Sequence, residues 1–454
     1  MDFKNKKVIV LGAGISGFGI AKVAKQLGAI TALSDAKPEN EIKYDLDELR
    51  QAGISVMLGK QTENMLEGLD YLIVSPGIPI GIPLIQAAKA RGISVMSEVE
   101  AAYRLCKVPL YAITGTNGKT TTTVLLGEFM KTLHKNVGIG GNIGTALSTE
   151  AVRVGLEGCV VAEISSYQLE GVIDFHPKIA AILNVTPDHI ARHGSLEKYQ
   201  QVKETIFAHQ DKNDYLVLNY DDPRVKDMAQ RTNSTVFFFS TKQQLTEGAY
   251  VEDNNLVVAW QGRKQHICSI DDMKIKGSHN VENALAAAGM AYLAGADLAK
   301  IAEVLRDFPG VEHRIEPVRV LNGVSYYNDS KATNPESAIK ALDTFADHII
   351  LIAGGHDKNT DLTEFMELVC KKVDQLILVG NAAARFKEAA LNHGFSGMNI
   401  HEVGYSMKEA VTLACTLAKE PQVVLLSPGC ASFDMFDGFE ERGRVFKDLV
   451  SKLS

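Results

Sequence analysis

The stretch Leu110-Tyr111-Ala112-Ile113-Thr114-Gly115-Thr116-Asn117-Gly118-Lys119-Thr120 decides the fold. Its first five residues predict a buried strand, and Thr121 to Leu133 predict a helix. A glycine-rich turn between a strand and a helix presents backbone N–H groups to a phosphate. Strand, glycines, Lys119 and helix follow the order of a P-loop, although Ile113 stands at the first glycine position. The stretch therefore predicts an ATP-binding loop.

The residue types of this loop predict its chemistry. Backbone N–H groups wrap the β-phosphate, Lys119 neutralises charge on the β- and γ-oxygens, and Thr120 offers a hydroxyl to Mg²⁺. The predicted ATP-binding residues are Gly115, Thr116, Asn117, Gly118, Lys119, Thr120 and Thr121.

Length and composition describe a globular chain with several domains. The 454 residues suggest about three domains at roughly 150 residues each. A hydrophobic fraction of 46% excludes a disordered chain, and the net charge of −8 argues against nucleic-acid binding. The charged N-terminus and the short apolar runs predict neither a signal peptide nor membrane insertion. Six scattered cysteines without CxxC spacing indicate reduced thiols, so we expect a cytoplasmic protein.

Short β-rich runs alternate with helical patterns along most of the chain, which predicts parallel sheets with crossover helices. The fold-class prediction is α/β with three domains: a Rossmann-like N-terminal unit, a central P-loop sheet with an antiparallel edge, and a Rossmann-like C-terminal unit. We place the antiparallel edge within Tyr215 to Gln265, where short strands alternate with polar turns. The predicted domains are 1–107, 108–309 and 310–454, with Pro309-Gly310 as a hinge.

A second glycine loop, Gly12-x-Gly14-x-x-Gly17, follows the strand Lys7 to Leu11, and Asp35 ends the next strand. This spacing is typical of a dinucleotide fold, in which glycines let the backbone approach a pyrophosphate and an acid binds a ribose hydroxyl. The pattern predicts a phosphate ligand but does not specify nicotinamide. A turn that begins at Ser75 lies near the same predicted crevice.

The ordered set of motifs resembles the Mur ligase family, which adds amino acids to peptidoglycan precursors. The matching runs are GTNGKT (115–120), GNIG (141–144), EISSYQL (163–169), NVTPDH (184–189), GSHNVEN (277–283) and His313-Arg314. Two more, DSKATNP (329–335) and SPGCASFD (427–434), resemble the member that adds D-glutamate. The chain departs from the pattern at Gly429, where Ala is usual, and at Ala191, where Asp is common.

The resemblance implies an ATP-dependent ligase that joins D-glutamate to UDP-N-acetylmuramoyl-L-alanine through an acyl phosphate, in cytoplasmic peptidoglycan precursor synthesis. It implies two Mg²⁺ sites, with Thr120, Glu163 and His189 as ligands and Lys119 and His189 as catalytic residues. Additional implied ATP-binding residues are Asn280, Asn283, Arg314 and Asp329. The implied UDP-substrate residues are Ile15, Ser16, Asp35, Ser75 and Asn142, and the implied D-glutamate residues are Thr333, Lys358, Ser432 and Phe439. Closure of the third domain over the nucleotide is expected.

The resemblance also implies that the side chain of Lys203 is chemically modified. It lies in the helical stretch Leu196 to Phe207, and an ordinary ammonium near two Mg²⁺ ions would be repelled. By the resemblance, its amine combines with CO₂ to give a carbamate, which is a third catalytic group and a metal ligand. The alternative is a solvated lysine beside Glu204.

Three alternatives remain open at the level of sequence. An NAD-linked oxidoreductase would use the first glycine loop but would leave Lys119 unexplained. A nucleotide-gated binding protein would leave the third-domain motifs unexplained. Another Mur ligase or a folylpolyglutamate-type ligase would share the ATP loop. For the ligase we expect UDP-N-acetylmuramoyl-L-alanine, D-glutamate and ATP as small-molecule partners, and a monomer.

Overall fold

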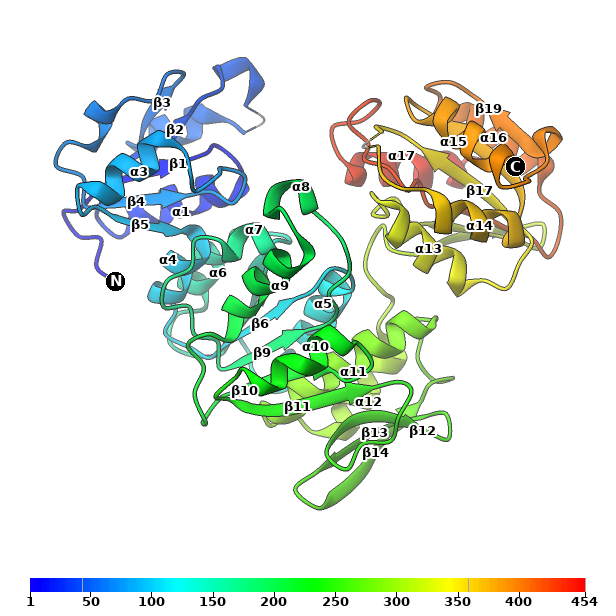
Figure 1. Ribbon diagram of the computed structural model, residues 1–454, viewed down its shortest axis with the longest axis horizontal. Coiled ribbons are helices and arrows are strands. Elements are labelled where there is room, and N and C mark those ends of the chain that lie inside the picture. Colours follow the sequence, from blue (N-terminus) through cyan, green and yellow to red (C-terminus); the bar gives the residue numbers. More distant parts are fainter. Residues whose placement is uncertain (43, 358, 454) are drawn as a thin grey trace. The chain divides into compact units, whose positions relative to one another are not determined.

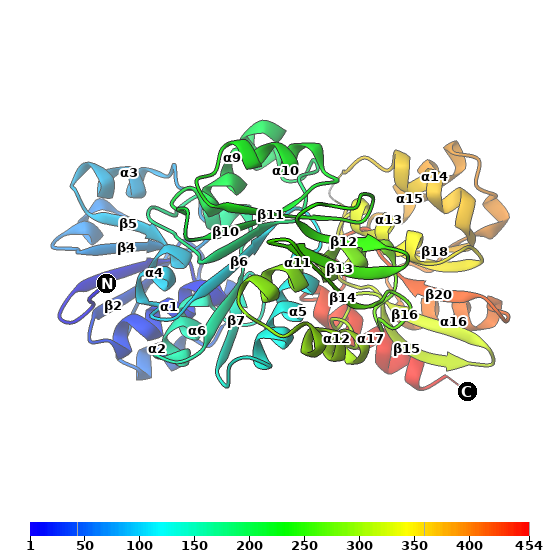
Figure 2. The ribbon, with the colours of Figure 1, turned by 90° about the horizontal axis from the view of Figure 1, so that it is seen from below.

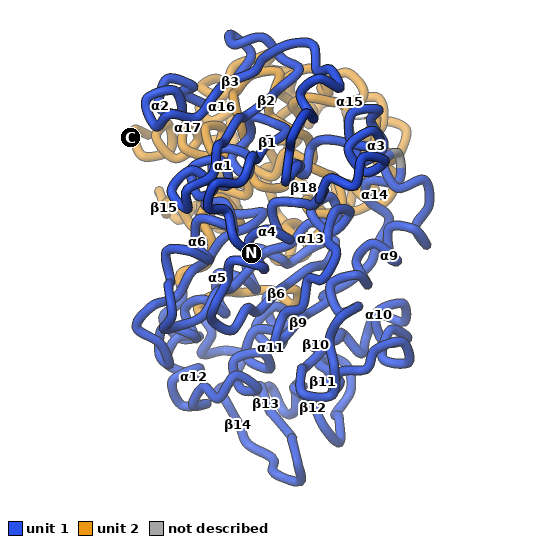
Figure 3. Tube along the Cα trace, turned by 90° about the vertical axis from the view of Figure 1, so that its left-hand side faces the viewer, with its two compact units in different colours: residues 1–273, 280–308 blue, residues 274–279, 309–454 orange. Residues whose placement is uncertain are grey.

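The computed structural model describes residues 1–42, 44–357 and 359–453, whose strands form three sheets (Figure 1). The predicted fold class, three α/β domains, is confirmed. By Cα packing the chain divides into two compact units, residues 1–273 with 280–308, and residues 274–279 with 309–454 (Figure 3). The first unit contains the N-terminal and central sheets, and the second contains the C-terminal sheet. The exact domain boundaries stay a prediction.

The N-terminal sheet is parallel, in the order β3-β2-β1-β4-β5. Its order reverses between β1 and β4, and α/β sheets bind ligands at the carboxyl ends of strands at such a point. The strands are β1 (Lys7–Leu11), β2 (Ile30–Asp35), β3 (Ser55–Leu58), β4 (Tyr71–Val74) and β5 (Ser94–Ser97). The helices are α1 (Ile15–Gln26), α2 (Leu46–Gln51), α3 (Pro83–Ala90) and α4 (Glu98–Leu105).

The central sheet has the order β14-β13-β12-β11-β10-β9-β6-β8-β7. Its inner strands are buried on both faces, as in β6 and β8, because helices cover both sides. The strands are β6 (Leu110–Thr114), β7 (Val137–Gly141), β8 (Cys159–Glu163), β9 (Ile179–Ile182), β10 (Tyr215–Asn219), β11 (Thr235–Ser240), β12 (Gly248–Glu252), β13 (Asn255–Trp260) and β14 (Arg263–Ser269). The helices are α5 (Lys119–Lys131), α6 (Leu147–Val154), α7 (Ser166–Leu169), α8 (Ile190–His193), α9 (Leu196–Glu204), α10 (Pro223–Asp227), α11 (Ser278–Leu293) and α12 (Leu298–Asp307).

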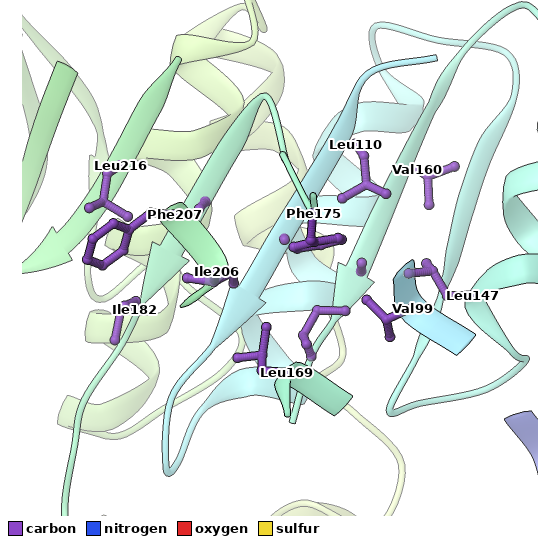
Figure 4. Packing of buried hydrophobic residues seen from close by; sticks show 14 of the residues in the cluster. Val99, Leu110, Leu147, Val160, Leu169, Phe175, Ile182, Ile206, Phe207 and Leu216 are labelled. Atoms are coloured by element: carbon purple, nitrogen blue, oxygen red, sulfur yellow. The ribbon is translucent and has the colours of Figure 1, made fainter. Parts of the chain in front are cut away.

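One face of the central sheet carries a large hydrophobic core. Leu110, Val160 and Ile182 from three neighbouring strands pack with Phe175 and Phe207 from the connecting segments (Figure 4). Burial of a side chain of this size stabilises the fold by roughly 1.5–3 kcal/mol. This packing fixes the strand ends that carry the glycine loop.

The predicted antiparallel edge is present but narrower than expected. Only the pairs β12–β13 and β13–β14 are antiparallel, whereas β10 and β11 are parallel strands of the main sheet (Figure 2). Helix α10 carries the chain back between β10 and β11, which makes that pair parallel. The two hairpins turn at Asp253-Asn254 and Gln261-Gly262, all with positive φ, as two-residue hairpin loops require.

The C-terminal sheet has the order β15-β16-β20-β17-β18-β19, and only the pair β15–β16 is antiparallel. Its strands are β15 (Glu316–Leu321), β16 (Val324–Asn328), β17 (Ile349–Gly354), β18 (Val373–Val379), β19 (Ile400–Glu402) and β20 (Val423–Leu426). Its helices are α13 (Pro335–Thr344), α14 (Thr363–Lys372), α15 (Ala383–Asn392), α16 (Met407–Leu417) and α17 (Phe439–Ser451). Across the described residues, no helix combines the length and hydrophobicity needed to cross a membrane.

Candidate active site

The glycine loop joins the carboxyl end of β6 to the first turn of α5. Gly115 has φ 155° and Gly118 has φ 84°, both in the region that side chains rarely adopt. Helix α5 begins at Lys119, two residues before the predicted start, because the left-handed Gly118 leads the chain directly into the helix. The loop geometry therefore depends on the glycines that the sequence singled out.

Asn184 braces this loop from the carboxyl side of β9. Its Oδ1 accepts hydrogen bonds from the backbone N–H of Thr116 (3.0 Å) and Asn117 (2.8 Å), and its Nδ2 donates to the Asn117 carbonyl (3.2 Å). The sequence prediction quoted Asn184 in a motif but gave it no role. Its position two residues after the end of β9 and four residues before Asp188 was the available signal.

Replacement of Gly118 by alanine is expected to disrupt the loop. A Cβ there would lie 2.3 Å from Oδ1 of Asn283, and the positive φ adds backbone strain of about 1 kcal/mol or more. We expect a lower free energy of unfolding and at least a tenfold loss of ATP affinity, measured by denaturation and calorimetry. Gly92→Ala, with a positive φ but open space around its Cβ, is the matched control and should keep its ATP affinity.

Two lysines meet at the carbonyl of Gly115. Lys119 Nζ donates to it (2.9 Å) and to the Thr116 carbonyl (2.7 Å), and Lys203 Nζ donates to it at 2.8 Å. Burial holds the pKa of Lys203 well below its usual range, the Lys119 charge lowers it further, and Asp188 opposes the shift. Lys203 is only 1% exposed, so it is not the solvated surface lysine of the alternative reading.

Glu163 ends β8 beside the loop and is 1% exposed. Its Oε1 accepts a hydrogen bond from Asn142 Nδ2 (2.7 Å), and its Oε2 is buried with no hydrogen-bond partner among the described residues. A buried carboxylate oxygen that lacks a donor is costly unless a cation or a ligand contacts it. Glu163 therefore fits the chemistry of a Mg²⁺ ligand.

His189 precedes α8 and has φ 54°, a left-handed conformation that is uncommon among non-glycine residues. Its Nδ1 lies 3.0 Å from the Tyr167 hydroxyl, and its Nε2 lies 3.5 Å from Oδ2 of Asp188. Asp188 also interacts electrostatically with Lys203, so the structure brings His189, Asp188 and Lys203 into one neighbourhood.

Arg192 is oriented by Glu170 from the segment after α7. Its Nε and Nη2 donate to the two carboxylate oxygens of Glu170 at 3.1 and 2.7 Å. Glu170 and Tyr167 also line a pocket of about 180 Å³ together with Ser75 and Ile78. The structure thus gives Arg192 a partner even though Ala191 departs from the family pattern.

Asn283 lies against Gly118 of the glycine loop. Its Oδ1 accepts a hydrogen bond from the Thr122 hydroxyl (3.2 Å), and its Nδ2 donates to Asn280 Oδ1 (3.3 Å). Helix α11 therefore places Asn280 and Asn283 one turn apart on the face toward α5. Thr120 and Thr121 lie in the first turn of α5, and Thr121 is buried.

The first glycine loop lies at the point where the N-terminal sheet reverses its order. The Ser75 hydroxyl donates to the Gly12 carbonyl (3.1 Å), and Asp35 Oδ2 accepts a hydrogen bond from the Ala13 N–H (2.7 Å). Ser16 is buried in the first turn of α1, whereas Ile15 is 44% exposed. The structure thus groups the four predicted residues of this domain around one turn.

In the second unit, Asp329 follows β16 and is fully buried. Its Oδ2 accepts a hydrogen bond from the Ser427 hydroxyl (2.7 Å), its Oδ1 accepts one from the Ile315 N–H (3.2 Å), and Arg314 Nη1 lies 3.9 Å from Oδ1. Burial raises the pKa of Asp329 to about 6, against the opposing effects of Arg314 and these hydrogen bonds.

This raised pKa predicts a pH-dependent stability. Between about pH 4 and 6 the native Asp329 holds a proton that the unfolded chain has lost, so stability falls as pH rises through this window. Relative to Asp329→Asn, the free energy of unfolding of the unmutated protein should fall by roughly 2 kcal/mol between pH 4 and pH 8, since the unfolded carboxyl is still partly protonated at pH 4. Chemical denaturation at several pH values measures this, and the exposed Asp448→Asn should show no such difference.

A buried arginine, Arg442, lies beside the segments that carry the predicted residues Ser432 and Phe439. Arg442 Nη2 donates to the Ser330 carbonyl (2.7 Å), and the Ser330 hydroxyl donates to the carbonyl of Phe439 (2.8 Å). Ser432 is buried, and Thr333 donates its N–H to the Lys331 carbonyl (2.9 Å). Lys358 lies outside the described residues, so its role in binding D-glutamate stays a prediction.

Models of three known domains match this chain in order. They are the Mur ligase MurD-like N-terminal domain (residues 6–97), the Mur ligase middle domain (113–291) and the Mur ligase glutamate ligase domain (313–430). The chain belongs to the Mur ligase family. The recognition made from the sequence motifs is confirmed.

Curated relatives of this Mur ligase align over their whole length. This chain is 44% identical to the UDP-N-acetylmuramoylalanine--D-glutamate ligase of Thermoanaerobacter sp. strain X514. The alignment spans 453 residues and covers 100% of both chains. The enzymes of the same name from Caldanaerobacter subterraneus and Clostridioides difficile strain 630 are 45% and 41% identical, again over 100% of both chains.

Solved structures support the fold of this Mur ligase. MurC, the UDP-N-acetylmuramate-alanine ligase of Thermotoga maritima, superposes with a TM-score of 0.61 at 20% identity and covers 98% of this chain and 99% of its own. A pseudomurein peptide ligase type C from Methanothermus fervidus superposes with a TM-score of 0.60 at 19% identity. The match covers 99% of this chain and 100% of that ligase.

Proposed function

We propose that this Mur ligase joins D-glutamate to UDP-N-acetylmuramoyl-L-alanine and converts ATP to ADP and phosphate. The full-length identity of 41–45% to ligases with that name carries the proposal. The glycine loop between β6 and α5 supports the ATP requirement. An NAD-linked oxidoreductase is not favoured, because the middle-domain match starts in the P-loop strand and extends into α11.

The chemistry begins with a carboxylate, which is a poor electrophile. Its oxygen attacks the γ-phosphorus of ATP and forms an acyl phosphate, whose phosphate then leaves when the amine of D-glutamate attacks the carbonyl carbon. Negative groups must approach one another in the first step, so cations and N–H donors are needed there. Lys119 and the backbone of residues 115–118 supply them in this proposal.

Glu163, His189 and Thr120 are proposed to hold Mg²⁺, and the unpartnered buried oxygen of Glu163 supports this. When bound, Mg²⁺ would neutralise phosphate charge near the reacting oxygens. Lys203 is proposed to act as a carbamate, supported by its burial and its low pKa, since a neutral amine is the form that reacts with CO₂. Two metal sites remain part of the proposal.

The substrate sites are assigned in the same proposal. Asn280, Asn283, Arg314 and Asp329 would bind ATP, and Ile15, Ser16, Asp35, Ser75 and Asn142 would bind the UDP-substrate. Thr333, Lys358, Ser432 and Phe439 would bind D-glutamate. We also predict a cytoplasmic location, a role in cell-wall synthesis during growth and division, and a monomeric state.

An isotope experiment tests the proposed reaction. The protein is incubated with ATP, Mg²⁺, D-glutamate and UDP-N-acetylmuramoyl-L-alanine labelled with ¹⁸O in its carboxylate. We expect a product heavier by one glutamyl residue and transfer of one ¹⁸O atom to the released phosphate. Amide formation without ¹⁸O in the phosphate would contradict the acyl-phosphate route.

A further inference from the structure

The side chain of Asn184 contacts the glycine loop through both ends of its carboxamide. Oδ1 accepts hydrogen bonds from the backbone N–H groups of Thr116 (3.0 Å) and Asn117 (2.8 Å), and Nδ2 donates to the carbonyl of Asn117 (3.2 Å). These groups belong to three successive peptide units. They directly precede Gly118, where the chain turns in a left-handed conformation into α5.

The three contacts require a side chain that accepts and donates hydrogen bonds at the same time. A carboxamide has an acceptor oxygen and an N–H₂ donor, whereas an aspartate carboxylate at this position would accept but have no proton to donate to a carbonyl. A leucine has a similar size and does neither. The position is therefore chemically specific for a short carboxamide.

The backbone around Asn184 is held by further contacts. The Asn184 carbonyl accepts a hydrogen bond from the Thr116 N–H (3.0 Å), and the Thr186 N–H donates to the hydroxyl oxygen of Thr116 (3.1 Å). The Val185 N–H donates to Oδ2 of Asp222 (2.9 Å), which also caps α10. The carboxamide thus extends from a backbone that is anchored without the nucleotide.

A loop that is ordered before its ligand arrives binds that ligand more tightly, because less conformational entropy is lost on binding. We propose that Asn184 is a positioning residue for ATP, whose carboxamide holds the loop before Gly118 in the conformation that receives the phosphates. This inference rests on the ATP site of the proposed function and adds a residue that acts on ATP through the loop.

The first test measures backbone hydrogen exchange in the full-length protein without nucleotide or metal. The Asn117 N–H donates to Asn184 at 2.8 Å, so its exchange should be at least about tenfold slower than in an unstructured peptide. It should become faster in Asn184→Leu. Exchange of the Asn117 N–H at the rate of an unstructured peptide in the unmutated protein would overturn the proposal, whatever the protein catalyses.

The second test compares ATP binding in Asn184→Leu and Asn184→Ala with ATP binding in Asn219→Leu. Asn219 provides the matched control, because it is also a buried asparagine that binds backbone groups, those of Leu183 and Asp221 rather than those of the glycine loop. Chemical denaturation measures the free energy of unfolding of each variant. Calorimetry measures the affinity for ATP with Mg²⁺ and, separately, for the UDP-substrate.

We expect the dissociation constant of ATP to rise about tenfold or more in both Asn184 variants and to change by less than about twofold in Asn219→Leu. The affinity for the UDP-substrate should stay the same in all three. In the ligase assay, KM for ATP should rise in the Asn184 variants, with less than about a threefold change in kcat at saturating ATP. Both leucine variants lose buried hydrogen bonds, so a loss of stability shared by the two does not explain an ATP effect seen in one.

Unchanged ATP affinity in the Asn184 variants, or an equal loss in Asn219→Leu, would overturn the inference and leave the proposed function standing. Absence of ATP binding by the unmutated protein would instead contradict the proposed function, and this inference with it.

Discussion

Lys119→Ala is expected to lower the rate of ligation by about a thousandfold or more and to leave the affinity for UDP-N-acetylmuramoyl-L-alanine nearly unchanged. Lys119 lies at the first turn of α5, and its Nζ already contacts the loop carbonyls of Gly115 and Thr116. Its charge is needed where phosphoryl oxygens gather, whereas the predicted uridine residues surround the turn after β1. The two functions therefore depend on different residues.

Phosphate release measures the rate, and calorimetry with the UDP-substrate measures the affinity. Lys131→Ala is the matched control, because Lys131 ends the same helix and pairs with Glu128 at the surface. It should retain both activity and binding. A large loss of UDP-substrate affinity in Lys119→Ala would show that the substrate sites are assigned to the wrong parts of the chain.

Lys203→Ala is expected to be nearly inactive, and formate or acetate should restore part of its activity. The amine is buried against the Gly115 carbonyl, where a permanent ammonium is unfavourable, and its pKa is low for that reason. A carbamate would convert it into an anion that resembles a carboxylate. A small carboxylic acid that enters the space left by the side chain would replace that anion.

The rates are measured with and without each acid, and Lys198→Ala serves as control because it removes an exposed lysine from the same helix. That variant should be active and insensitive to the acids. Full activity of Lys203→Ala without any acid would rule out an essential carbamate, and activity that no acid restores would argue for a role of the amine itself.

The sequence predicted the parts of the fold that depend on local patterns. The bounds of β1 and β6 agree with the prediction, because short runs of β-branched and aliphatic residues end at glycine, proline or polar turns. The glycine loop could be placed for the same reason, since strand, turn and helix are adjacent in sequence. The narrower antiparallel edge was not foreseen, because β10 and β11 carry no local mark of their parallel pairing.

Features that depend on distant contacts were less accessible. The sequence of its helix allows Lys203 to be either an exposed lysine beside Glu204 or a site residue. The structure shows that Lys203 is buried, and its amine contacts the carbonyl of Gly115, 88 positions away in the sequence. The bracing of the loop by Asn184 and the pairing of Tyr167 with His189 likewise arise from tertiary packing. A strand-end position suggests such residues but does not name their partners.

A comparison of amino acids as acceptors of the activated carboxylate most directly tests whether this Mur ligase is a D-glutamate ligase. The protein is given ATP, Mg²⁺ and UDP-N-acetylmuramoyl-L-alanine with D-glutamate, L-glutamate, L-alanine, diaminopimelate, lysine or D-alanyl-D-alanine, and phosphate release and product mass are recorded. We predict release and a heavier product with D-glutamate alone. Equal or faster ligation of another amino acid, or no ligation with D-glutamate, would contradict the assignment.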